Sequence, residues 1–127
     1  MKNIFKLIML VCIGLLLNAC YYDAFPEVAE EDIPDIPDTQ VVSFKNEIEP
    51  LFGFCAGCHN DSRDPDLREG NSYNSLFPNY VIKGDAEGSL FYQYLPGNGM
   101  HPEVGRTLTN DEIALIKAWI NQGAEDN

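Results

Sequence analysis

Residues 55 to 59 read Cys55-Ala56-Gly57-Cys58-His59, two cysteines separated by two small residues and followed directly by a histidine. The two thiols of such a motif can add across the two vinyl groups of a haem as thioethers, and the imidazole can bind the haem iron. Two intervening residues match the separation of the vinyl groups, and small side chains let this turn lie close to the porphyrin. The motif therefore predicts one covalently attached haem c, held by Cys55, Cys58 and His59.

Two other interpretations of these residues remain open. A C-x-x-C pair forms a redox disulfide in thioredoxin-like proteins, but that motif belongs to a βαβ setting, whereas the residues before Cys55 have a helical pattern. Zinc could bind Cys55, Cys58 and two histidines. However, Cys58 and His59 are adjacent and would strain a tetrahedral site, and the chain has no second C-x-x-C. We favour haem attachment over both.

The N-terminal residues have the pattern of an export signal. Lys2 and Lys6 precede an apolar stretch over residues 7–17, which is too short to span a bilayer as a helix. The stretch ends Leu17-Asn18-Ala19-Cys20, which resembles the bacterial lipobox. That resemblance implies a lipoprotein signal peptide over residues 1–19, cleavage before Cys20 and lipidation of the Cys20 sulfur. An ordinary signal peptide cut elsewhere, with Cys20 left free, is the alternative. The lipobox implies an exported, membrane-anchored protein facing the periplasm, with the outer membrane favoured over the inner.

Residues 20–40 are expected to form a disordered, acidic linker. They contain seven acidic residues, three prolines and no lysine or arginine, so like charges repel and backbone donors are lost. A solvated spacer is favoured over an acidic docking segment for a basic partner. The remaining residues, 41–127, are enough for one small domain, in which a buried haem would supply apolar mass that so short a chain lacks.

Both ends of this domain are expected to be helical. Ser43 is a suitable N-cap for a helix over residues 44–52, which Pro50 should kink or end early. Residues 109–112 form a capping box, and apolar residues at helical spacing follow it until Gly123.

Between these helices, Ser89 could cap a short helix over residues 90–94. No alternating strand of useful length and no internal repeat is present, so the predicted fold class is all-α. The aromatic residues expected to line the haem cavity and the helix interface are Phe52, Phe54, Tyr73, Phe77, Tyr80, Phe91, Tyr92 and Trp119.

Over residues 43–124 the chain resembles class I cytochromes c, and within them the small planctomycete-type cytochrome c domains. The matching elements are the first helix, the C-x-x-C-H motif, Asp66-Leu67, Gly84-Asp85 with Ser89-Leu90, Met100, and Trp119-Ile120-Asn121-Gln122-Gly123-Ala124. The resemblance implies the cytochrome c fold, with the N- and C-terminal helices packed around one haem. It also implies Met100 as the sixth iron ligand. One departure matters, because His101 follows the methionine where the family has proline.

Composition limits the sixth ligand to two residues. Met1 and Met9 would leave with the signal peptide, so Met100 is the one methionine of the mature chain, and His101 is the one histidine besides His59. Met100 is the expected ligand, and a soft thioether there would raise the potential. His101 remains the alternative.

The function that follows is single-electron transfer by an electron carrier, with no catalytic residues and no enzyme activity expected. A haem peroxidase or oxidase, or a haem-based sensor, is the alternative and would need a labile sixth ligand. The formal net charge of −12 excludes nucleic acid as a partner and favours a redox partner protein with a basic docking face. Contact with the membrane should come through the lipid anchor. Arg63, Arg68 and Arg106 are candidates for pairing with a haem propionate.

Overall fold

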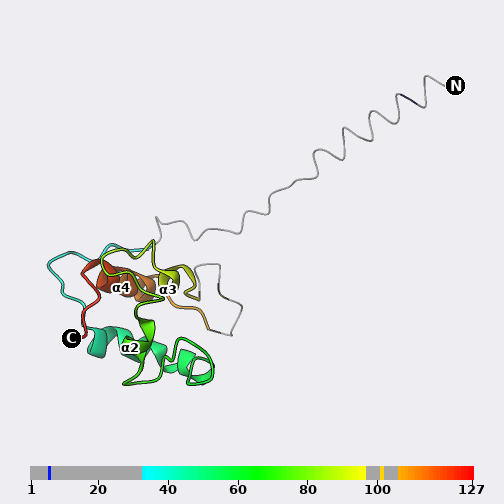
Figure 1. The fold of residues 1–127 in the computed structure, drawn as a ribbon. Coiled ribbons are helices and arrows are strands. Elements are labelled where there is room, and N and C mark those ends of the chain that lie inside the picture. Colours follow the sequence, from blue (N-terminus) through cyan, green and yellow to red (C-terminus); the bar gives the residue numbers. More distant parts are fainter. Residues whose placement is uncertain (1–5, 7–32, 97–100, 102–105) are drawn as a thin grey trace.

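The computed structural model describes residue 6, residues 33–96, residue 101 and residues 106–127 (Figure 1). Within this part of the chain the regular structure is helical, and its one β-type pairing is an isolated antiparallel bridge between Ile82 and Asp85. The predicted all-α class is confirmed for the described residues. None of the helices in these ranges is long and apolar enough to cross a membrane.

The first helical segment consists of two short helices, the π-helix η2 (Phe44–Ile48) and the 3-10 helix η3 (Glu49–Gly53). Ser43 caps η2 as predicted, because its hydroxyl accepts a hydrogen bond of 3.3 Å from the backbone nitrogen of Asn46. Pro50 lies in the first turn of η3, where the absence of its N–H is tolerated but a preceding α-helix could not continue through it. The predicted interruption of this helix is therefore confirmed.

The last helix, α4 (Asn110–Asn121), begins at the predicted capping box. The Thr109 hydroxyl accepts a hydrogen bond of 3.2 Å from the Glu112 nitrogen, and the Glu112 carboxylate accepts one of 2.8 Å from the Thr109 nitrogen. The two groups thus satisfy each other's backbone donors at the start of the helix. After α4, Gly123 takes a positive φ of 105°, which turns the chain back towards the first helix.

The core joins the first and last helical segments. The rings of Phe44 and Trp119 lie 5.0 Å apart, and Tyr73 meets Phe44 edge-on at 5.2 Å. The indole nitrogen of Trp119 donates a hydrogen bond of 2.9 Å to the backbone oxygen of Glu125, so burial of this side chain leaves no polar atom without a partner. The buried residues of α4 are Ile113, Ala114, Ile116, Trp119 and Ile120.

The end of the chain is fixed beside the start of η2 (Figure 1). The side-chain oxygen of Asn127 accepts a hydrogen bond of 2.7 Å from the Phe44 nitrogen, and its backbone oxygen accepts one of 2.9 Å from the Lys45 nitrogen. The domain is therefore closed by contacts between residues more than 80 positions apart in the sequence.

Two shorter helices, α2 (Ser72–Leu76) and α3 (Leu90–Gln93), lie between the terminal segments. The sequence predicted α3 but not α2. Ser89 is the N-cap residue of α3, as predicted, but its side chain makes no capping hydrogen bond. Its buried hydroxyl donates a hydrogen bond of 2.6 Å to the Asp85 oxygen and accepts one of 2.9 Å from the Ile82 nitrogen. Ser89 therefore closes the turn that precedes α3.

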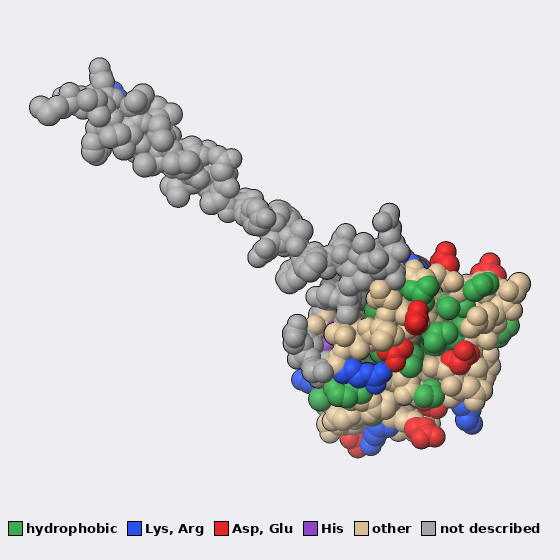
Figure 2. Space-filling view, turned by 180° about the vertical axis from the view of Figure 1, so that it is seen from behind, with side chains coloured by type: hydrophobic (Ala, Val, Ile, Leu, Met, Phe, Trp, Pro, Cys, Tyr) green, Lys and Arg blue, Asp and Glu red, His purple; other side chains and the backbone are tan. Residues whose placement is uncertain are grey.

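The aromatic residues divide between core and surface. Phe52 and Phe91 are buried and meet nearly perpendicularly, with ring centroids 5.5 Å apart. Phe54, in contrast, is 48% exposed and lies outside the core. Figure 2 views the molecule from behind relative to Figure 1. On this face, hydrophobic side chains at the surface are interspersed with acidic ones.

The final residues of the expected linker, 33–40, pack on the domain. Ile33 and Ile36 are half-buried against the core. The Gln122 side chain accepts a hydrogen bond of 3.0 Å from the Val42 nitrogen and donates one of 2.8 Å to the Gln40 oxygen. Residues 33–40 therefore lie against the domain, where Ile33 and Ile36 contact apolar side chains and Gln122 pairs with the adjacent backbone.

Candidate cofactor site

The C-x-x-C-H residues form a single tight turn directly after η3. Cys55–Gly57 is the 3-10 helix η4, and the backbone nitrogens of Cys58 and His59 both donate to the Cys55 oxygen, at 3.0 and 2.8 Å. Both thiols are free; Cys55 is half-buried and Cys58 is exposed. The two sulfurs and the imidazole are thus presented from one turn of backbone, as thioether attachment to a single group would require.

His59 has an unsatisfied buried nitrogen. Its Nδ1 is the one buried side-chain nitrogen or oxygen without a hydrogen-bond partner among the described residues. A buried polar atom in this state costs about 1–3 kcal/mol, and its presence in a folded protein calls for an explanation such as a bound group. The main chain of His59 is fixed, since its oxygen accepts a hydrogen bond of 3.1 Å from Leu67. The backbone of His59 is therefore fixed while its imidazole keeps a buried nitrogen without a hydrogen-bond partner, which suits binding to a metal or a metal-containing cofactor.

The surroundings of Cys55 are mainly apolar. Burial raises the pKa of the Cys55 thiol above its usual value, and the nearby charge of Arg106 acts in the opposite direction. A small cleft opens beside the thiol, lined by Leu51, Phe54, Cys55, Pro96, Arg106, Thr107 and Leu108. Such a wall suits the edge of a flat, largely apolar macrocycle, and Arg106 adds one positive charge next to it.

The structure distinguishes the three arginines that the sequence left equivalent. Arg106 lies at the cleft, although its guanidinium also pairs with Glu112 at 2.8 Å. Arg68 is engaged elsewhere, because its guanidinium makes a two-pronged contact with Asp66 at 2.9 and 2.6 Å. Arg63 is exposed. Arg106 is therefore the arginine placed to pair with an acidic group of a cofactor bound at Cys55.

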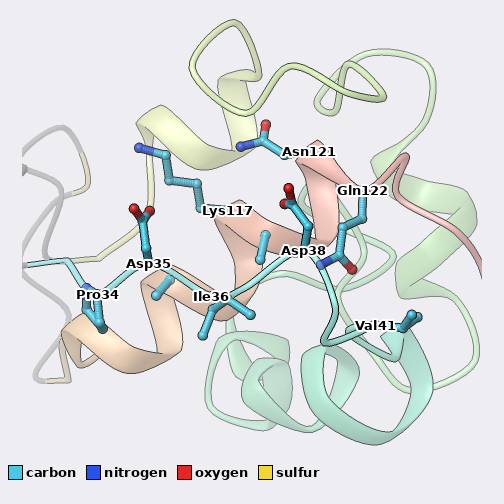
Figure 3. A pocket seen from close by; sticks show the side chains of 10 residues that line it. Pro34, Asp35, Ile36, Asp38, Val41, Lys117, Asn121 and Gln122 are labelled. Carbon is cyan, nitrogen blue, oxygen red and sulfur yellow. The ribbon is translucent and has the colours of Figure 1, made fainter.

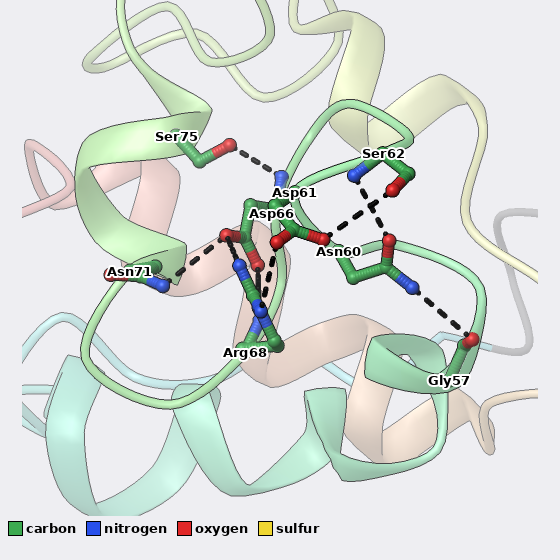
Figure 4. Close-up of polar contacts among 8 residues, drawn as sticks. All are labelled: Gly57, Asn60, Asp61, Ser62, Asp66, Arg68, Asn71 and Ser75. Carbon is green, nitrogen blue, oxygen red and sulfur yellow. Dashed lines mark hydrogen bonds and ion pairs between the residues drawn. The ribbon is translucent and has the colours of Figure 1, made fainter.

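The loop after the motif is organised around Asp66 (Figure 4). The hydrogen bonds from Arg68 hold the pKa of this carboxylate well below its usual range, at about 2. Asn71 donates a further hydrogen bond of 3.2 Å to Asp66. This network fixes the backbone on either side of Leu67, the residue that hydrogen-bonds to His59. Asp66 therefore helps to fix the loop that is hydrogen-bonded to the backbone of His59.

The described residues include His101 but not Met100 or Cys20, so the predicted roles of the last two lie outside the described ranges. His101 is half-buried, and its ring centroid lies 6.1 Å from that of His59, with 49° between the ring planes. The structure thus brings together His59 and the alternative sixth ligand. No group of three or more histidine, cysteine, aspartate or glutamate side chains in the described ranges is arranged to hold a metal ion.

A cavity of about 530 Å³ lies away from these residues, between the segment over residues 34–41 and α4 (Figure 3). Its walls carry carboxylates from Asp35 and Asp38 and the ammonium of Lys117, which also pairs with Glu87 at 2.8 Å. The wall contains no cysteine or histidine. This cavity therefore offers neither a thiol nor an imidazole, and it adds no haem-binding residue to the motif.

Comparison with protein-family models and with curated proteins gives no match. Among solved structures, the chain is similar to hydrazine synthase from Kuenenia stuttgartiensis, with a TM-score of 0.54 and 27% sequence identity. The match covers 65% of this chain and 16% of that chain, so this protein corresponds to a small part of the other. The likeness contradicts the prediction that the protein has no enzymatic role, because the matched structure is that of an enzyme. A domain of this kind can therefore form part of a catalytic protein.

Proposed function

We propose that the chain is a redox domain that carries one covalent haem c and transfers single electrons within or beside an enzyme. The observation that carries the proposal is the turn over residues 55–59. It presents two free thiols and an imidazole with an unpartnered buried nitrogen. When bound, a haem would supply an iron that changes oxidation state by one electron. The similarity to part of a synthase supports placing this domain in a catalytic assembly.

The chain's own residues would determine how the cofactor is held. Cys55 and Cys58 would form the thioethers, and His59 would bind the iron from one side. The resemblance to class I cytochromes c assigns the opposite side to Met100, and the sequence leaves His101 as the alternative; electron transfer needs only that one of them fill this position. Leu51 and Leu108 would shield the apolar edge from water.

The exposure of Cys58 and Phe54 bears on how electrons would enter and leave. Both side chains are at the surface next to the half-buried Cys55, so the thioether edge of the cofactor would lie close to solvent. A redox partner could therefore dock beside the two cysteines that would hold the cofactor. With a net charge of −12, the chain would favour a redox partner with a basic face.

Location completes the proposal. Lipidation of Cys20 would hold an exported, periplasm-facing protein on a membrane, preferably the outer one. Residues 33–40 pack on α4, so any free tether between lipid and domain would be shorter than the residues 20–40 expected from composition. A shorter tether would keep the domain nearer to membrane-bound partners.

The proposal is tested on the exported, full-length protein by redox titration of its visible spectrum. A single one-electron transition that requires Cys55 and Cys58, and that survives Cys20→Ser, supports it. The matched control removes a cysteine of the same chain that lies outside the motif. Reduction and reoxidation without any haem spectrum would refute it.

A second candidate, a haem that itself binds and transforms a substrate, is favoured by the similarity to hydrazine synthase. It requires an open or labile sixth position. Carbon monoxide added to the reduced protein and peroxide added to the oxidised protein distinguish the two. Rapid binding or turnover supports the catalytic haem, and an unchanged spectrum supports electron transfer.

A further inference from the structure

The two histidines of the chain lie together although 42 positions separate them in the sequence. Their ring centroids are 6.1 Å apart and their planes are inclined by 49°. Both residues are half-buried. Two imidazoles that bind one metal ion from opposite sides have metal–nitrogen bonds of about 2 Å and ring centres about 1.1 Å beyond each nitrogen, which gives about 6 Å between the centroids. The observed separation matches that arrangement.

An ordinary ring contact is the competing explanation, since aromatic pairs pack at comparable distances. The state of His59 argues against it. Its buried Nδ1 has no hydrogen-bond partner, so His101 does not satisfy this atom despite its proximity. Ring packing alone would leave this buried nitrogen unsatisfied, whereas a group bound at the imidazole would account for it.

Described residues on either side of His101 in the sequence also lie beside the motif. The Leu108 nitrogen donates a hydrogen bond of 3.0 Å to the Pro96 oxygen. Pro96 and Leu108 both line the cleft beside Cys55. Together with the contact between the two histidine rings, this places His101 on the same side of the domain as the predicted cofactor.

We infer that His101, and not Met100, is the iron ligand opposite His59, so that the domain holds a bis-histidine haem. This inference rests on the proposed function, because it presupposes a haem attached at Cys55 and Cys58. Imidazole stabilises ferric iron better than a thioether does, so the midpoint potential would be lower than methionine ligation gives. With both axial positions filled by imidazoles, the iron would not bind external ligands unless His101 were displaced.

The test uses the full haem-loaded protein and the adjacent variants His101→Ala and Met100→Leu. The first measurement is the amount of covalent haem per chain, and a chain without it would overturn the proposed function together with this inference. In haem-loaded protein, we expect no near-infrared sulfur-to-iron charge-transfer band in the oxidised state. Met100→Leu should leave the low-spin spectrum and the midpoint potential unchanged, whereas His101→Ala should become high-spin and bind carbon monoxide.

The His101→Ala variant has a second possible result that also supports the inference. If Met100 then binds the iron, the sulfur-to-iron band should appear for the first time and the potential should rise. The inference is overturned, with the proposed function intact, if haem-loaded wild type shows that band, Met100→Leu abolishes it and His101→Ala leaves it unchanged. Met100→Leu is close in volume to the wild type, so it keeps the comparison informative if His101→Ala loads haem poorly.

Discussion

The backbone nitrogen of His59 donates a hydrogen bond of 2.8 Å to the backbone oxygen of Cys55. This single bond closes one turn between the first cysteine and the histidine of the motif. It fixes the backbone that carries the first thiol and the imidazole before any cofactor is present. The site is thus preorganised by backbone geometry, and the energy of binding need not be spent on ordering this turn.

Trp119 should be the most costly side chain to truncate in the domain. It is 1% exposed and its ring packs against Phe44 at 5.0 Å, so Trp119→Ala leaves a large cavity between α4 and η2. We expect a loss of about 3–5 kcal/mol in the free energy of unfolding, measured by urea denaturation. Leu90→Ala, at a position 49% exposed, is the control and should change that free energy by about 0.5 kcal/mol or less. Equal losses in the two variants would contradict this core.

The capping box should contribute separately to stability. Thr109→Ala removes the hydroxyl that accepts from the Glu112 nitrogen, and we expect a loss of about 1 kcal/mol in unfolding free energy. Thr39→Ala, at an exposed residue outside the helices, serves as the matched control. A Thr109 variant as stable as the control would show that the start of α4 does not depend on its cap.

Asp66 should make the stability of the domain depend on acid pH. Its pKa is held at about 2 in the folded protein, against about 3.9 in an unfolded chain. Since the folded-state value is the lower one, the stabilisation is fully present above about pH 4 and is lost as the pH falls towards about 2. Urea denaturation of wild type and Asp66→Asn should therefore differ at pH 7 and converge near pH 2.

The control for that experiment is Glu69→Gln, which removes an exposed carboxylate from the same loop. Its difference from wild type should be small at both pH values. If Asp66→Asn is as stable as wild type at pH 7, the contacts from Arg68 do not stabilise the folded state.

Membrane attachment should depend on Cys20 alone. Cys20→Ser removes the predicted lipidation site, so the protein should leave the membrane fraction while its visible spectrum stays the same. Fractionation after a high-salt wash measures this. Retention of the variant in the membrane pellet would rule out the lipobox interpretation.

The parts of the fold that sequence predicts well depend on local chemistry. The capping box at Thr109 and the proline at position 50 act on their own helices, so both could be identified without tertiary information. Ser89 has the residue type of a helix cap, but the turn at Ile82 and Asp85 competes for its hydroxyl, and only the folded structure reveals that partner. The five residues of α2 have no side-chain capping hydrogen bond at their N-cap and no distinctive sequence pattern, so this helix was not predicted.

One part of the candidate site can also be predicted from the sequence, and another part cannot. Cys55, Cys58 and His59 lie within five consecutive residues, so their motif can be recognised without a structure. The proximity of His101 to His59 is a tertiary contact between residues 42 positions apart in the sequence. Local pattern alone could name His101 as a candidate but could not place it.

The central claim is that a haem is covalently attached to the two cysteines of the motif. Its most direct test is the mass of the protein exported by a host able to attach haem, combined with the haem spectrum in alkaline pyridine. We predict one haem per chain that survives denaturation, and its complete loss in the double variant Cys55→Ala, Cys58→Ala. A chain of unmodified mass in such a host, or haem that dissociates on denaturation, would contradict the account.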